Sequence, residues 1–146
     1  MKNPAALLCH CLATLVASSS MAQTPALVVQ NAWTRLTPGT DVAAVYLTVR
    51  NVSARPVIVI AVQSPIARQA MIHETKTESG QARMRPHEQL VIAPGQTVKL
   101  EPGGLHVMLH GLARPVIPGQ SLPLVLLLDG GGSVQVAALV RPLNAQ

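Results

Sequence analysis

The stretch LHVMLH, residues 105–110, alternates strictly between aliphatic side chains and histidine or methionine. Side chains two apart in a strand point to the same face, whereas a helix groups residues three or four apart. We therefore expect a β-strand whose three aliphatic side chains face a core. His106, Met108 and His110 should then point together toward a binding site or toward solvent.

The chain on either side of this stretch has the same β character. Short apolar and β-branched runs are separated by turn-forming residues such as Asn51-Val52-Ser53 and Ala93-Pro94-Gly95, and no window keeps a helical period beyond two turns. The predicted strands are 26–36, 43–50, 57–62, 70–75, 97–101, 105–109, 122–128 and 134–140. This pattern predicts an all-β fold, a two-sheet sandwich of the Greek-key, immunoglobulin-like or cupredoxin-like kind. Residues 23–146 should form one domain.

The N-terminal residues 1–22 resemble a secretory signal peptide. Lys2 is followed by an apolar run, and Ser20-Met21-Ala22 has the small-x-small pattern that a signal peptidase cleaves. The run is shorter than the roughly 20 residues that a transmembrane helix needs. We therefore expect export to the periplasm, cleavage after Ala22 and no membrane span in the mature chain. A lipoprotein attached through Cys9 or Cys11 is the alternative, although neither cysteine follows the usual small residue.

Composition excludes several classes of function. The sequence has 2 cysteines, both in the expected signal peptide, so a chain cleaved after Ala22 would offer no thiolate for a zinc finger, thiol redox chemistry or a blue-copper site. The net charge is +5, but the basic residues are scattered, and one Trp, one Tyr and no Phe leave little to stack on bases. We expect no nucleic-acid partner.

All histidines and methionines beyond residue 23 lie between positions 71 and 110. Met71 and His73 should share one face of their strand, opposite Ile72. Isolated methionines usually fill cores, and isolated histidines usually lie at the surface; these interpretations stay open for Met71 and His87.

A hairpin could bring Met84 close to His73. Residues 76–81 contain Ser79-Gly80, a plausible two-residue turn. A turn centred near residues 78–79 would place His73 directly opposite Met84, and a shift of one residue would make them diagonal neighbours.

Clustered histidine and methionine favour one metal in particular. Cu(I) is a soft ion that prefers thioether and imidazole, whereas hard cations prefer oxygen and Cu(II) prefers tetragonal nitrogen and oxygen. Methionine also forms no disulfide in an oxidising compartment. Two histidines and two methionines therefore suit reversible Cu(I) carriage, with Cu(II) binding left open.

The spacing of these residues resembles the periplasmic copper chaperones called PCu(A)C. Their pattern is His, ten residues, Met, twenty-one residues and His-x-Met, and His73, Met84, His106 and Met108 fit it throughout. The surrounding segments 31–35, 44–47, 84–86 and 102–109 are also similar to the family.

The resemblance implies a cupredoxin-like domain that binds one Cu(I) ion through those four residues. It further implies a chaperone, not an enzyme, that delivers copper toward the Cu(A) centre of cytochrome c oxidase. Its partners would be the oxidase copper subunit or another copper assembly factor. The chain departs from the family at His110, where relatives often have Met, and at Ala82, where some carry a further Met.

Other functions compete with this interpretation. A copper-buffering or resistance protein of the periplasm would use the same ligands without delivery. A redox enzyme or electron carrier on the same sandwich would need more histidines or a cysteine. A metal-free sandwich used for protein recognition would leave the clustering of His and Met unexplained.

Overall fold

A computed structural model describes residues 26–35 and 39–143 of the chain. The expected signal peptide and its cleavage site lie outside the described residues. Within those residues no helix is long and apolar enough to cross a bilayer. The described strands are β1 Leu27–Arg35, β2 Val42–Asn51, β3 Val57–Gln63, β4 Ala67–Glu78, β5 Gln81–Pro86, β6 Leu90–Ile92, β7 Thr97–Leu100, β8 Leu105–Leu112, β9 Ser121–Leu128 and β10 Ser133–Arg141.

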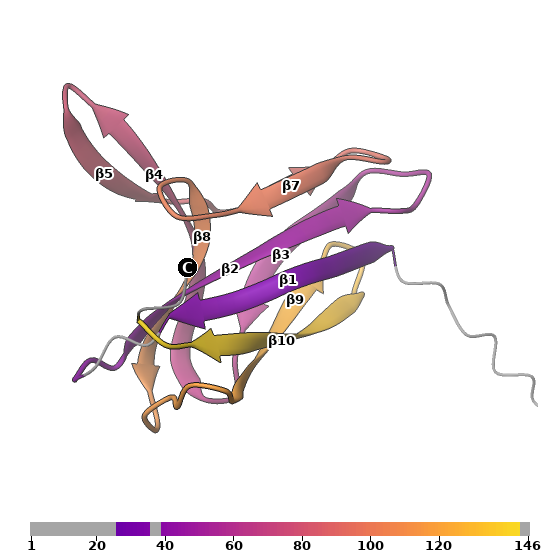
Figure 1. Ribbon diagram of the computed structural model, residues 1–146. Coiled ribbons are helices and arrows are strands. Elements are labelled where there is room, and N and C mark those ends of the chain that lie inside the picture. The colour runs from indigo at the N-terminus through magenta and orange to yellow at the C-terminus, as the bar shows by residue number, and fades with distance from the viewer. Residues whose placement is uncertain (1–25, 36–38, 144–146) are drawn as a thin grey trace, which may run out of the picture.

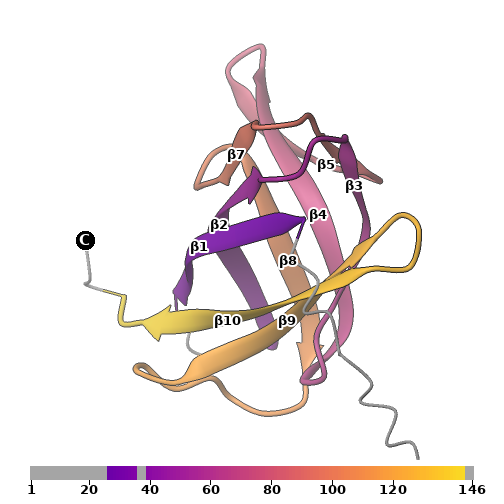
Figure 2. The ribbon, with the colours of Figure 1, turned by 90° about the vertical axis from the view of Figure 1, so that its right-hand side faces the viewer.

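The strands follow one another in the order β5-β4-β8-β2-β1-β10-β9-β3-β6, and this sheet folds over on itself. Every pairing is antiparallel except that of β1 with β10. In Figures 1 and 2, β4, β8 and β2 form one layer and β10, β9 and β3 lie across from them. The predicted all-β sandwich is confirmed.

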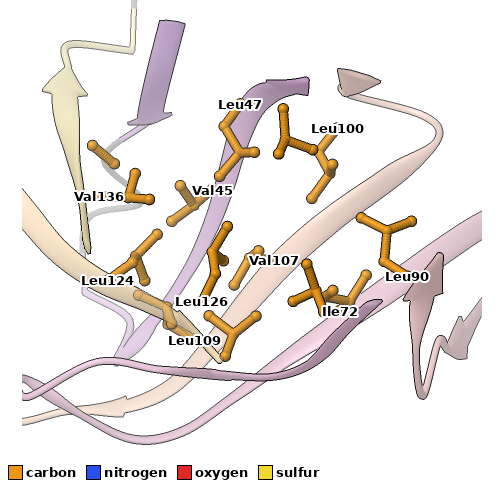
Figure 3. Packing of buried hydrophobic residues seen from close by; sticks show 14 of the residues in the cluster. Val45, Leu47, Ile72, Leu90, Leu100, Val107, Leu109, Leu124, Leu126 and Val136 are labelled. Atoms are coloured by element: carbon orange, nitrogen blue, oxygen red, sulfur yellow. The ribbon is translucent and has the colours of Figure 1, made fainter. Parts of the chain in front are cut away.

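The core fills the space between the two layers. Val45 of β2, with Val107 and Leu109 of β8, packs toward Leu124 and Leu126 of β9, as Figure 3 shows. Each of these strands alternates buried with less buried residues, so one face of each strand supplies the core. The opposite face of β8 and β4 does not supply the core, so its side chains can serve as ligands.

The strand β2 changes partner along its length. Its first half pairs with β8, where Ala44 lies opposite Met108, and its second half pairs with β7. On its other side β2 pairs with β1, and a bulge between Gln30 and Trp33 interrupts that ladder. After the bulge Trp33 lies opposite Tyr46, so the two large aromatic residues meet beside β8.

The β4–β5 hairpin projects beyond the body of the sandwich (Figure 1). Its turn is formed by Ser79 and Gly80, whose φ angles of 52° and 78° are both positive. Two positive φ angles define the type I′ turn that suits the twist of a two-residue hairpin. The turn fixes the register at Glu78 opposite Gln81, and hence the register of the whole hairpin.

The structure changes the bounds of several strands expected from sequence. The strand predicted at 70–75 runs from Ala67 to Glu78, and β6 (Leu90–Ile92) was not predicted as a strand at all. β6 has only three residues and is held by pairing with β3. Such a strand is specified by its partner more than by its own pattern.

Candidate metal centre

The outer faces of β4 and β8 gather the histidines and methionines singled out by the sequence. Antiparallel pairing places His73 opposite His106, Met71 opposite Met108 and Gln69 opposite His110. The intervening residues Ile72, Val107 and Leu109 are buried in the core. The predicted division of the two strands into a core face and a His/Met face is therefore observed.

His106 is held in one orientation by the backbone. The side chain is 5% exposed, and its Nδ1 lies 3.0 Å from the carbonyl oxygen of Gly104. Because a carbonyl only accepts hydrogen bonds, Nδ1 must carry the proton in this contact. The lone pair of the neutral ring then lies on Nε2, the arrangement by which backbone carbonyls commonly orient a metal-binding histidine.

The ring of His73 stands edge-on to that of His106. Their centroids are 5.9 Å apart and their planes make an angle of 90°. The Nδ1 atom of His73 is enclosed and has no hydrogen-bond partner among the described residues. Burial lowers the pKa of His73 below its ordinary value of 6.5, and charge on His106 and then His110 would lower it further. His73 is therefore biased toward the neutral form that a metal ion requires.

Met84 reaches the same face by way of the hairpin. Thr75 lies opposite Met84 and His73 lies opposite Pro86, so His73 and Met84 are diagonal neighbours. Of the two registers considered from sequence, the diagonal one is observed, because the turn centres on Ser79-Gly80. Met84 is 56% exposed, which leaves its thioether at the solvent boundary of the cluster.

The remaining histidines and methionine occupy different positions. The ring of His110 comes within 6.4 Å of the ring of His73, measured between centroids. The sulfur of Met71 accepts a contact from Gln69 Nε2 at 3.5 Å. His87 follows β5, and its backbone N–H donates to the Ile72 carbonyl at 2.8 Å. His87 also lines a hollow of about 250 Å³ together with residues of β3 and β4.

Two aromatic residues beside the cluster were not assigned a role from sequence. The ring of Tyr46 lies 6.4 Å from that of His106, and Trp33 packs on Tyr46 at 4.6 Å between centroids. The guanidinium groups of Arg141 and Arg35 lie 4.6 and 5.3 Å from the Trp33 ring. Tyr46 is two residues from Ala44, which pairs with Met108, so strand alternation could have placed it on this face.

The candidate ligand atoms are of two kinds, imidazole nitrogen and the softer thioether sulfur. In the described ranges no three His, Cys, Asp or Glu side chains form a group that could hold a metal ion. A centre on this face would therefore combine imidazole nitrogen with thioether sulfur. Such a mixed set favours a soft ion such as Cu(I) over hard cations.

The fold belongs to a class of β-sandwich domains known from solved structures. The copper-bound PCuAC domain of PmoF2 matches with a TM-score of 0.68 at 23% identity, over 82% of this chain and 96% of that domain. DR1885 of Deinococcus radiodurans, in its Cu(I) form, matches with a TM-score of 0.61 at 30% identity, over 84% of this chain and 83% of that protein.

Sequence comparison identifies the family. Residues 27–140 match the LpqE-like family, described as "Putative lipoprotein LpqE-like". The "Putative lipoprotein Lxx21020" of Leifsonia xyli subsp. xyli (strain CTCB07) is 32% identical over 117 residues, which are 80% of this chain and 70% of that relative. The chain therefore belongs to the LpqE-like family.

Proposed function

We propose that this protein is an exported copper chaperone that carries one Cu(I) ion on His73, Met84, His106 and Met108. It would release the ion toward the Cu(A) centre of cytochrome c oxidase, directly or through another copper assembly factor. Copper is its cargo, and the protein performs no catalysis.

The pairing of His73 with His106 is the observation that carries this proposal. The two rings are 5.9 Å apart between centroids, and His106 leaves Nε2 free because Nδ1 contacts Gly104. His73 offers a nitrogen that has no partner in the described part of the chain. Two neutral imidazoles on adjacent strands can both serve as nitrogen ligands of one cation.

The methionines supply the preference for Cu(I). Met108 follows His106 on the same face of β8, and Met84 lies diagonal to His73. Thioether sulfur is a soft donor that stabilises Cu(I) and does not compensate its charge. Because Met84 is 56% exposed, a partner's ligand could displace it first, which suits transfer better than storage.

The known relatives support copper and export. DR1885 has been solved with Cu(I) and the PmoF2 domain with copper, and this chain shares their fold. The LpqE-like relatives carry lipoprotein names, which fits a protein that acts outside the cytoplasm. Copper buffering by the same ligands is the alternative, and a transfer assay to a purified oxidase copper subunit separates it from delivery.

Substitution of the methionines by leucine tests the ligand set. Leucine and methionine are similar in volume, and such exchanges usually cost less than about 1.5 kcal/mol of stability. Met84→Leu and Met108→Leu should each lower Cu(I) affinity steeply and leave the melting curve of the metal-free protein nearly unchanged. The measurement is an anaerobic competition titration against a Cu(I) chelator.

Met71→Leu is the matched control for this test. Met71 lies opposite Met108 on the same face but outside the proposed ligand set, so its exchange should leave Cu(I) affinity intact. Unchanged affinity in both Met84→Leu and Met108→Leu would refute the two-His, two-Met centre. An equal loss in Met71→Leu would show that the thioether ligands are wrongly assigned.

A further inference from the structure

We propose that the outer face of β1, β2, β7 and β10, here called the basic sheet face, is the docking surface for the protein that receives copper from this chain. The partner would meet this face with an acidic surface of its own. The inference rests on the proposed function and deepens it, because it assigns the surface that a recipient contacts. The ion passes from one set of ligands to another, and no electron is transferred.

The face of β4 and β8 that carries the proposed ligands continues across the neighbouring strands. The ring of Tyr46 in β2 lies 6.4 Å from that of His106, and Trp33 of β1 lies opposite Tyr46 with 4.6 Å between ring centroids. Leu139 of β10 lies opposite Trp33 and is 45% exposed. This row forms an aromatic and apolar surface that begins beside His106.

The charged residues of the basic sheet face are all cations. No described position of β1, β2, β7 or β10 is Asp or Glu, and strand alternation places the basic side chains of these strands on the outer face. These residues are Arg35, Arg50, Lys99 and Arg141. Arg35 lies directly opposite Arg141. Like charges in that position repel each other, so an acidic group bound across the pair would be favoured.

The positive charge is confined to the layer that carries the proposed metal centre. The strands β3, β6 and β9, on the other side of the core, contain no charged residue at their described positions. Among the described acidic residues, Glu74 and Glu78 pair with cations of the β4–β5 hairpin, and Asp41 faces Arg68. An acidic partner would therefore be attracted to one side of the sandwich.

Direct transfer requires the partner to cover the basic sheet face. The partner's ligand atom must come within about 2 to 2.5 Å of the ion, so the two protein surfaces must touch around the centre. A specific interface buries about 800 Å² on each partner, which corresponds to a circular patch of roughly 16 Å radius. Neighbouring strands are about 4.8 Å apart, so β2, β1 and β10, which follow β8 in the sheet (Figures 1 and 2), fall within this radius.

An acidic protein fits this face better than an anionic lipid surface does. Aromatic residues and arginine are enriched in the centres of protein interfaces, and Trp33, Tyr46 and Arg141 lie together here, with the Arg141 guanidinium 4.6 Å from the Trp33 ring. Lipid head groups carry no imidazole or thioether that could accept Cu(I). A recipient protein can supply both the negative charge and the ligands.

Charge reversal on the basic sheet face tests the inference. Arg141→Glu and Lys99→Glu should each slow anaerobic Cu(I) transfer to the purified soluble domain of the oxidase copper subunit by roughly two- to tenfold at low salt. The difference from wild type should shrink as salt is added, because salt screens exposed charges. Cu(I) affinity, measured by competition titration, should be unchanged, because neither residue is a proposed ligand.

Leu139→Ala tests the apolar part of the same face. Leu139 is 45% exposed, so its truncation should alter the melting curve little. It should slow transfer at low and at high salt alike, because salt does not screen an apolar contact.

Arg114→Glu is the matched control for the charge reversals. Arg114 is exposed in the segment between β8 and β9, where the neighbouring Ala113 donates a backbone hydrogen bond to Ile66. The variant makes the same change in net charge away from the basic sheet face and should transfer copper at the wild-type rate. An equal slowing in Arg114→Glu would show that only net charge matters and would overturn the inference.

Three further outcomes are decisive. Wild-type transfer rates in Arg141→Glu, Lys99→Glu and Leu139→Ala would overturn the docking surface and leave copper delivery standing. Wild-type protein that binds Cu(I) but passes none to the domain at any salt concentration would refute delivery itself, and the docking surface with it. Co-sedimentation with phosphatidylglycerol vesicles that Arg141→Glu abolishes, with transfer unchanged, would assign the face to lipid instead.

Discussion

His73 and His106 lie opposite each other on adjacent strands, yet the surroundings of their ring nitrogens differ. His106 is buried and tied to the Gly104 carbonyl, so its ring orientation and tautomer are set before any metal arrives. His73 has an enclosed nitrogen without a partner among the described residues. An unsatisfied buried polar atom costs about 1–3 kcal/mol, and a bound ion would remove that cost. One histidine is preorganised and the other gains a partner on binding.

The lowered pKa of His73 makes a testable prediction about pH. Burial depresses the pKa below 6.5 in the folded protein, so the unfolded chain takes up this proton first as the pH falls. The associated stability is present above pH 6.5 and is lost as the pH falls through the lowered pKa. An NMR titration of the His73 ring in the metal-free protein should therefore give a midpoint below 6.5.

The same shift should protect metal binding from acid. Protons compete with the ion for imidazole nitrogen, so Cu(I) binding should persist to a lower pH than an unperturbed histidine would allow. The variant His73→Gln removes this titration, and the pH dependence of its apo stability should flatten between pH 6.5 and the lowered pKa. A ring midpoint at or above 6.5 would contradict the burial argument.

The β4–β5 hairpin positions Met84 relative to His73. Gly80 has a φ of +78° with open space around it, so an alanine there meets no neighbour but must adopt a left-handed conformation. That strain costs roughly 1–2 kcal/mol. Gly80→Ala should lower the melting temperature and also lower Cu(I) affinity, because a distorted turn shifts Met84 away from His73.

Gly95→Ala provides a control with the same local strain. Its φ is +74°, again with open space, but it lies in the turn between β6 and β7. We expect a similar loss of stability with unchanged Cu(I) affinity, measured by the same competition titration. Equal Cu(I) affinities in the two variants would mean that the turn does not control the position of Met84.

The strands were largely predictable, and their pairing was not. Alternation identified the core and outer faces of β8, and the Ser79-Gly80 turn limited the hairpin to two registers. No local pattern indicates that β4 lies beside β8, because that pairing depends on how the whole sheet folds over. For the same reason the burial of His106 could not be anticipated, because the ring beside it, that of Tyr46 at 6.4 Å between centroids, belongs to β2.

In the whole molecule, the residues that form the core and the proposed metal ligands lie on opposite faces of the same strands. Val107 and Leu109 point into the core, while His106 and Met108 alternate with them on the outer face. Substitutions of the proposed ligands should therefore alter metal affinity far more than folding. The exception is His106, which is itself 5% exposed and whose replacement removes packing as well as a donor.

The proposed export makes a prediction about the N-terminal residues. The sequence of residues 1–22 predicts cleavage after Ala22, so mass analysis of the protein recovered from the exporting cell should give a chain that starts at Gln23. A lipidated chain that starts at Cys9 or Cys11 would contradict this and agree with the lipoprotein names of the relatives. Retention of Met1 would contradict export itself.

The contact between the rings of Trp33 and Tyr46 has a practical consequence. Trp33 is the only tryptophan of the sequence, and Tyr46 connects it to His106 through ring contacts of 4.6 and 6.4 Å. The fluorescence of Trp33 therefore originates beside the proposed ligands, and arrival of copper should change its intensity. Loading and release could then be followed in real time by stopped-flow mixing without any added dye, with the dark variant Trp33→Phe as the blank.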